Sequence, residues 1–110
     1  MSVAEFRQAV TNCAEQFFPQ AKIELEERRG VELRLRVHVD ETTFINVYYS
    51  GLTDKKSYAL ISANQRIFGY DNSRFWHCHP SDNPQQHVAC AEPSPEQVFR
   101  QISQIINEKS

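Results

Sequence analysis

Two histidines one residue apart, His77 and His79, are the strongest chemical signal in this sequence, because the chain contains only four histidines. Alternate side chains of a strand point the same way, so both imidazoles would project from one face, about 6.6 Å apart along the strand. Trp76 and Cys78 would then point to the opposite face. We therefore predict a pair of imidazoles on the wetter face of a sheet, with Trp76 and Cys78 in the core.

Such a pair could carry out general acid–base catalysis. Imidazole titrates near ~6.5, so at neutral pH one ring can accept a proton while another donates one. Rings that flank a phosphodiester could take the proton of a 2′-hydroxyl and protonate the leaving oxygen. This is metal-independent RNA cleavage, with His77 and His79 as base and acid. In this interpretation Asp71 orients a ring and Arg74 binds the phosphate.

The same residues allow two other interpretations. A metal ion could bind His77 and His79, with His87 or Asp71 as a third ligand. However, structural zinc usually has four ligands at Cys/His spacings that this chain lacks, so we expect no tightly bound zinc and no cofactor. Histidines on a sheet face also occur without any chemistry. The chain would then be a non-catalytic module that binds a protein partner through this edge or face.

Substrate contacts are expected near the paired histidines and on one other strand. Tyr70 could stack on a base, since stacking on an aromatic ring does not require a particular base. Asn72 could contact the substrate, although an Asp-Asn pair also favours a hairpin turn. Arg34 and Arg36 alternate on the outer face of a strand, where they could neutralise a phosphate or form ion pairs with nearby carboxylates.

The elements that position these residues follow from a change in hydrophobic period. Apolar residues recur at helical spacing after a capping box formed by Ser2 and Glu5, and Pro19 ends that helix. From Lys22 the period becomes two, in "KIELEER", "VELRLRVHVD", "TTFINVYYS", "SYALISA", "QRIFGYD" and "RFWHCH". The segment that follows reads mostly as loop. Ser94, with Pro95 after it and a glutamine three residues on, then begins a second helix.

These elements predict a single α+β domain over residues 1–110. It consists of an N-terminal helix, an antiparallel β-meander of about five or six strands and a C-terminal helix. Each helix has one apolar face to bury, so both should cover the same face of the sheet in a two-layer sandwich, with Phe99 at the edge of the second apolar stripe. The predicted buried residues are Phe6, Val10, Phe17, Leu33, Leu35, Val37, Trp76, Val98, Ile102 and Ile105.

Composition narrows the class of protein. A formal net charge of −2 argues against a dedicated binder of duplex DNA, which needs a clearly basic face. Three cysteines without framework spacing suggest reduced thiols in a cytoplasmic protein. The N-terminal residues lack a basic region followed by an apolar run, and no window approaches ~18 apolar residues, so we expect no signal peptide and no membrane partner.

Three short motifs carry a resemblance to a known family: "FGYDNS", "HCHP" and "EPSPEQVFRQI". With them the chain resembles the TumE-like toxins of prokaryotic toxin–antitoxin modules, over residues 30–108 and best over residues 66–100. The resemblance implies an antitoxin partner with a helix-turn-helix domain and an RNA target. It points to Asp71, Asn72, His77 and His79 as site residues. The chain departs from the family at Phe75-Trp76, where members often carry glycine or further histidines.

Overall fold

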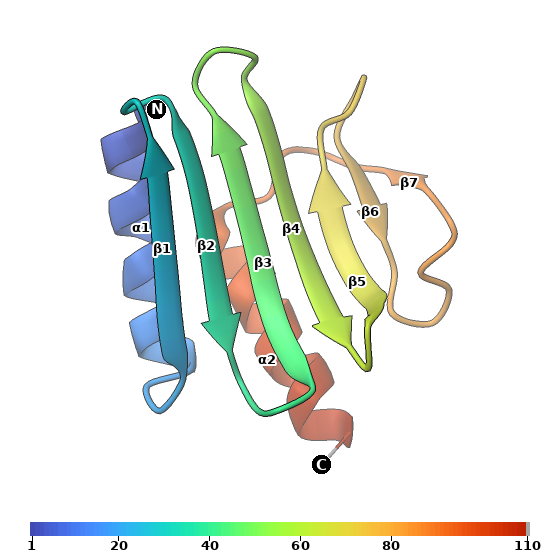
Figure 1. The fold of residues 1–110 in the computed structure, drawn as a ribbon. Helices are drawn as coiled ribbons and strands as arrows, with labels where there is room; N and C mark the ends of the chain where they lie inside the picture. Colours follow the sequence, from blue (N-terminus) through green and yellow to red (C-terminus); the bar gives the residue numbers. More distant parts are fainter. Residues whose placement is uncertain (110) are drawn as a thin grey trace.

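A seven-stranded antiparallel sheet with two helices on one face makes up the computed structural model, which describes residues 1–109 (Figure 1). Its elements in chain order are α1 (Val3–Phe17), β1 (Lys22–Arg28), β2 (Glu32–His38), β3 (Thr43–Ser50), β4 (Lys55–Ser62), β5 (Gln65–Asp71), β6 (His77–His79), β7 (Val88–Ala89) and α2 (Pro95–Lys109). No helix within the described residues is long and apolar enough to cross a membrane.

The sheet is a plain meander, in which each strand pairs with the next one along the chain from β1 to β7. The predicted α+β sandwich is therefore confirmed, with more strands than expected. The additional strand is β7, in a segment predicted to be loop. It exists because Val88 and Ala89 pair with Cys78 and His77 of β6. β6 itself is only three residues long, since the chain before it turns instead of continuing the strand.

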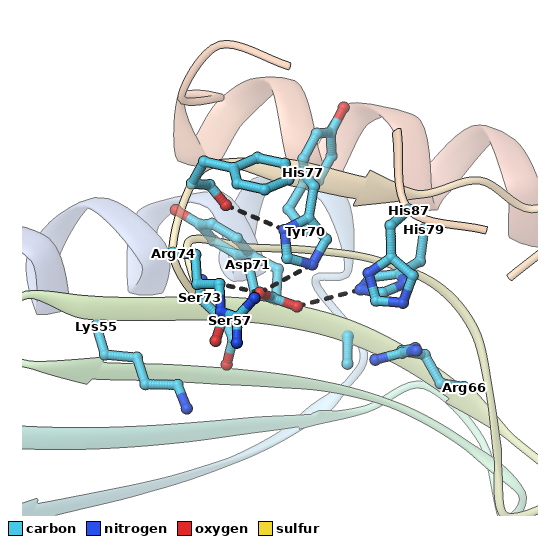
Figure 2. A pocket seen from close by; sticks show the side chains of 13 residues that line it. Lys55, Ser57, Arg66, Tyr70, Asp71, Ser73, Arg74, His77, His79 and His87 are labelled. Carbon is cyan, nitrogen blue, oxygen red and sulfur yellow. Dashed lines mark hydrogen bonds and ion pairs between the residues drawn. The ribbon is translucent and has the colours of Figure 1, made fainter. Parts of the chain in front are cut away.

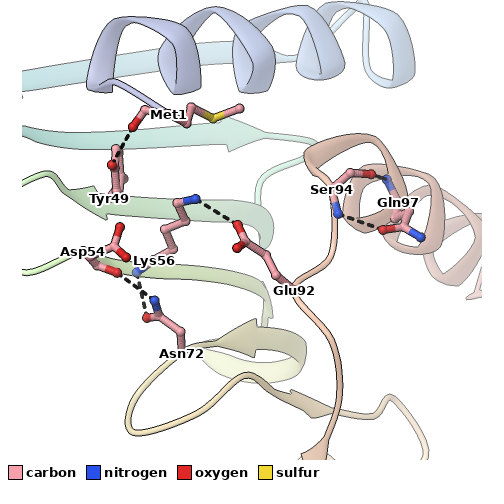
Figure 3. A network of polar contacts seen from close by, with 8 residues as sticks. All are labelled: Met1, Tyr49, Asp54, Lys56, Asn72, Glu92, Ser94 and Gln97. Carbon is pink, nitrogen blue, oxygen red and sulfur yellow. Dashed lines mark hydrogen bonds and ion pairs between the residues drawn. The ribbon is translucent and has the colours of Figure 1, made fainter.

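Both helices begin at the predicted capping boxes. The Ser2 hydroxyl accepts from the Glu5 N–H at 3.0 Å, and the Glu5 carboxylate accepts from the Ser2 N–H at 2.9 Å. Ser94 and Gln97 repeat the arrangement at 3.1 and 2.8 Å (Figure 3). These reciprocal bonds satisfy N–H groups that a helix start otherwise leaves without partners, which fixes where each helix begins.

The core lies between the helices and the inner face of the sheet. Leu33, Leu35 and Val37 of β2 are fully buried, while Arg34 and Arg36 between them are exposed, as the alternation predicted. Most predicted core residues are buried, and so are inward-facing residues of β3, β4 and β5. The buried hydrophobic residues are Phe6, Val10, Cys13, Ala14, Leu33, Leu35, Val37, Ile45, Val47, Tyr49, Tyr58, Leu60, Phe68, Tyr70, Val98, Phe99, Ile102 and Ile105.

Four core predictions need correction, and one of them concerns Cys78, which is only partly buried. Phe17 is only partly buried, because it is the last residue of α1 and lies at the margin, where the Arg100 guanidinium covers its ring at 5.5 Å. Trp76 is also partly buried, since it precedes the short strand β6 near the sheet edge. Phe99 was expected at the edge of its stripe but is fully buried, with its ring 6.4 Å from that of Phe18.

Strand β2 supplies a test of how deeply its inward-facing residues are buried. Leu35→Ala should lower the free energy of unfolding by about 2–5 kcal/mol, because it empties a fully buried site. Leu25 stands opposite Leu35 on β1 and is 48% exposed, so Leu25→Ala is the matched control and should cost on the order of 1 kcal/mol or less. Urea unfolding followed by circular dichroism measures both. Equal losses in the two variants would contradict the difference in burial between Leu35 and Leu25.

Candidate functional site

The pairing of β5 with β6 brings the predicted site residues together. Asp71 stands directly opposite His77, and Gly69 stands opposite His79. Tyr70, between Gly69 and Asp71, points toward the helices, where its hydroxyl donates to Gln101 of α2 at 2.7 Å. Asp71, His77 and His79 therefore project from the face of the sheet that the helices leave uncovered, as the close-up in Figure 2 shows.

Gly69 is required at its position beside His79. A Cβ atom there would lie 2.5 Å from the Tyr58 carbonyl oxygen of β4, closer than such atoms can approach. The ladder between β4 and β5 also shifts register between Leu60 and Ile61. The close backbone approach at Gly69 lies two residues before Asp71, and the irregular part of the ladder lies nearer the start of β5.

The Asp71 carboxylate holds the cluster together. Its Oδ1 accepts from the Ser73 N–H at 3.0 Å and lies 3.1 Å from Nε2 of His77. Its Oδ2 accepts from Nε2 of His79 at 3.1 Å. Burial raises the pKa of Asp71, but the Ser73 N–H, the His79 hydrogen bond and the electrostatic effect of the two rings outweigh it, so the pKa is lowered overall. The group is therefore a carboxylate that accepts hydrogen bonds from both sides.

The second nitrogen of each ring has a different environment. Nδ1 of His77 lies 3.0 Å from the Phe75 carbonyl oxygen, to which it donates. Nδ1 of His79 is buried and has no hydrogen-bond partner within the part of the chain that the structure describes. The two imidazoles thus differ in hydrogen bonding although they share one carboxylate.

The histidine pair is buried, which corrects the expectation of a wet sheet face. His77 is 5% exposed and His79 is 1% exposed. The loop between β6 and β7 folds back over them, so that the exposed ring of His87 lies 4.9 Å from that of His77 and 4.6 Å from that of His79, centroid to centroid. The ring of Phe75 lies 5.5 Å from that of His77 on another side. Strand parity predicted the face correctly but could not predict this cover.

His87 also completes a group of three imidazoles. His77, His79 and His87 each offer a ring nitrogen, and these atoms lie within 4.8 Å of one another. The sequence offers His87 or Asp71 as a third metal ligand, and both residues lie against the histidine pair.

A hollow of about 640 Å³ opens beside the cluster. Arg74 borders it, in a left-handed backbone conformation with φ of 72°. Sequence reasoning missed two further cations there, Lys55 of β4 and Arg66 of β5 (Figure 2). None of these three side chains forms an ion pair with a described carboxylate. The alternation in "KKSYALIS" could have indicated Lys55, because it places Lys55 and Ser57 on the outer face of the strand beside β5.

The other predicted substrate-binding residues lie apart from the histidines or have different partners. Arg34 and Arg36 are on β2, and β3, β4 and β5 separate them from β6. Arg34 lies 3.5 Å from the Glu32 carboxylate, and the Arg36 guanidinium lies over the Phe44 ring at 4.5 Å. Tyr70 borders the hollow, but its hydroxyl contacts α2 on the helix side.

The cysteines have environments that disfavour reaction. Burial raises the pKa of Cys78, with a further contribution from Cys90, and burial also raises the pKa of Cys90. A thiol with a raised pKa forms less of the thiolate that reacts. Cys78 and Cys90 are therefore better suited to packing than to nucleophilic attack.

Asn72 has a structural role that can be tested separately from substrate binding. Its side chain accepts from the Lys56 N–H at 2.9 Å and donates to the Asp54 carbonyl at 2.7 Å, which ties the end of β5 to the start of β4 (Figure 3). Asn72→Ala should therefore cost about 1–3 kcal/mol, because backbone groups lose their partner. Ser73→Ala is the control, since Ser73 uses its backbone N–H, and should change stability by less than ~0.5 kcal/mol. Unchanged thermal unfolding of Asn72→Ala would refute this role.

Comparison with known proteins supplies the family. The chain matches no curated protein and no solved structure. A family model described as "Toxin TumE" matches residues 8–110, which is nearly the whole chain. This agrees with the resemblance carried by the sequence motifs, and the chain belongs to the TumE toxin family.

Proposed function

We propose that this chain is the toxin of a toxin–antitoxin module and that it cleaves RNA without a metal ion, at the hollow beside Asp71, His77 and His79. Family membership supports the toxin assignment. One observation favours the reaction most. A single carboxylate contacts two imidazoles, and the other nitrogen of His77 has a hydrogen-bond partner, whereas that of His79 has none among the described residues.

The hydrogen-bond partners suggest which ring is the acid and which is the base. Nδ1 of His77 faces a carbonyl oxygen and Nε2 faces a carboxylate oxygen, so both nitrogens are best occupied by protons. This ring can act as the general acid. Nε2 of His79 donates to Asp71, which leaves Nδ1 with a lone pair and no hydrogen-bond partner within residues 1–109. His79 can therefore act as the general base once His87 moves aside and uncovers it.

The proposed step is transesterification within RNA. Nδ1 of His79 removes the proton of a 2′-hydroxyl, and that oxygen forms a bond to the adjacent phosphorus. The bond from phosphorus to the 5′-oxygen breaks as His77 gives this oxygen a proton. The products are a 2′,3′-cyclic phosphate and a 5′-hydroxyl. Each proton transfer needs a positioned group, and together they account for catalysis without a metal.

The charges around the hollow suit a phosphodiester. Lys55, Arg66 and Arg74 border it, and Asp71, the one carboxylate among the residues that line it, is already bound to the histidines. Cations placed where phosphate charge develops stabilise the transition state. The net charge of −2 belongs to the whole chain and does not prevent a locally basic site.

The mechanism predicts a specific pattern of cleavage. His77→Ala and His79→Ala should each lower the rate by about 10²–10⁴-fold, and the double change should lose much less than the product of the two. Excess EDTA should leave the rate unchanged. His38→Ala is the matched control, because His38 lies on β2 against Glu24, far along the sheet from the site.

Purified protein and a synthetic RNA provide the assay, with circular dichroism to show that each variant folds. A strand with one 2′-deoxy substitution at the cleaved position should resist cleavage there. Undiminished cleavage of that strand would rule out attack by the 2′-hydroxyl. No cleavage of any RNA, together with tight binding to a protein partner, would favour the non-catalytic interaction module.

The proposed partner is an antitoxin with a helix-turn-helix domain. Phe75 is 55% exposed at the rim of the hollow, so a partner that packs on it would also close the site. Phe75→Ser should therefore reduce co-purification with the product of the adjacent gene. Leu25→Ser, which changes a similarly exposed residue on the opposite edge strand, should not. Equal recovery of the partner with both variants would place the contact elsewhere.

A further inference from the structure

His77 and His79 of β6 and His87 of the loop before β7 lie close together beside the hollow (Figure 2). We propose that these three imidazoles bind a divalent transition metal ion of the zinc class, and that the bound ion inhibits the site. Metal binding stands on the geometry alone. The inhibitory effect rests on the proposed function, because it requires that the histidines carry out proton transfer.

The first support is the buried nitrogen of His79. Its Nδ1 is out of contact with solvent and has no hydrogen-bond partner among the described residues, in a side chain that is 2% exposed. A buried polar atom without a partner destabilises the folded protein, because it has lost its contact with water and gained nothing in return. A metal ion would satisfy this lone pair, and the ring of His87 lies 4.6 Å away, centroid to centroid, on the exposed side of the cluster.

The second support is the orientation of His79 by Asp71. The Asp71 carboxylate accepts from Nε2 at 3.1 Å, which places the ring proton on Nε2 and the lone pair on Nδ1. Histidines that bind metal commonly donate their other nitrogen to a carboxylate in this way, because the contact fixes the tautomer and makes the ligand more basic. The carboxylate that orients the base therefore also prepares a metal ligand.

The ligand set indicates the class of metal. Three imidazole nitrogens suit zinc, copper or nickel, whereas magnesium and calcium prefer oxygen ligands. Cys78 does not add a thiolate, since it alternates with the histidines and points to the other face. Three protein nitrogens leave one tetrahedral position for water. The site is therefore an open one, unlike the closed four-ligand sites that hold structural zinc.

Binding requires a small adjustment of the rings. Zinc–nitrogen distances of about 2.0–2.1 Å in a tetrahedron place the nitrogens roughly 3.4 Å apart, and here they lie within 4.8 Å. His87 can move inward because it is exposed on a loop. His77 must release either Asp71 or the Phe75 carbonyl, so we expect His79 and His87 to bind first and His77 to complete the site.

A bound ion would occupy the lone pair that the reaction needs. With Nδ1 of His79 bound to metal, no base remains for the 2′-hydroxyl, and His87 is held over the pair instead of moving aside. Zinc should then inhibit RNA cleavage, and chelation should restore it.

The binding test uses untagged protein, because a histidine tag would bind the same ions. Zinc chloride titrated into EDTA-treated and dialysed protein should give one site by calorimetry, and cobalt chloride should give the absorption bands of tetrahedral cobalt. Asp71→Asn should weaken zinc binding by about 10–100-fold, as loss of an orienting partner does, and His87→Ala should weaken it at least as much. His38→Ala is the control and should bind as the wild type does. His87 is exposed, so its replacement should leave the fold intact.

The outcomes separate this site from the proposed reaction. No zinc binding, or equal binding by wild type and His87→Ala, would overturn the metal site whether or not RNA is cleaved. One zinc bound through His87 without any RNA cleavage would uphold the site and refute the proposed function. Cleavage that needs zinc would uphold the site and overturn inhibition. The last outcome supports both zinc binding and inhibition. RNA is cleaved in EDTA, zinc suppresses cleavage by wild type and His38→Ala, and His87→Ala needs a higher zinc concentration for the same effect.

Discussion

A carboxylate at the end of β5 is the constraint on which the site depends. Asp71 is largely withdrawn from water and must have its charge satisfied, which two hydrogen bonds and one ion-pair contact achieve. The Ser73 N–H bond turns the chain after β5, and the two imidazole contacts fix the chain that returns as β6. The same carboxylate thereby sets the loop, the register of the last strands and the proton positions on the rings.

The imidazoles that contact Asp71 are shielded from water on some sides and open to the hollow on another. Phe75 and His87 shield the imidazoles, which strengthens their interaction with Asp71 because nearby water is displaced. The rings nevertheless border an open hollow that is lined by three cations, none of which forms an ion pair with a described carboxylate. A rigid sheet therefore holds the histidines, and an exposed loop residue covers them. This arrangement suits a site in which the sheet fixes the positions of the histidines while a loop residue controls whether a ligand can reach them.

Sequence reasoning succeeded where periodicity carried the information. The change of hydrophobic period at Lys22 and the cap at Ser94 predicted the helices and the sheet. The spacing of His77 and His79 predicted that both side chains lie on one face. Burial of that pair could not be predicted, because alternation tells which way a side chain points and not what lies over it. The covering loop has no period, so the place of His87 depends on tertiary packing. Asn72 satisfies backbone groups of β4, a role that follows only from the strand register.

The order of the strands has a consequence for how the chain folds. Each strand pairs with its neighbour in the sequence, so every pairing closes a short loop and loses little chain entropy before contacts form. The cluster of Asp71 and its histidines lies within one such local pairing. The contact between α1 and α2 joins the two ends of the chain and is far more distant in sequence. We expect rapid formation of the sheet, with docking of the two helices as the late step that commits the chain to its native state.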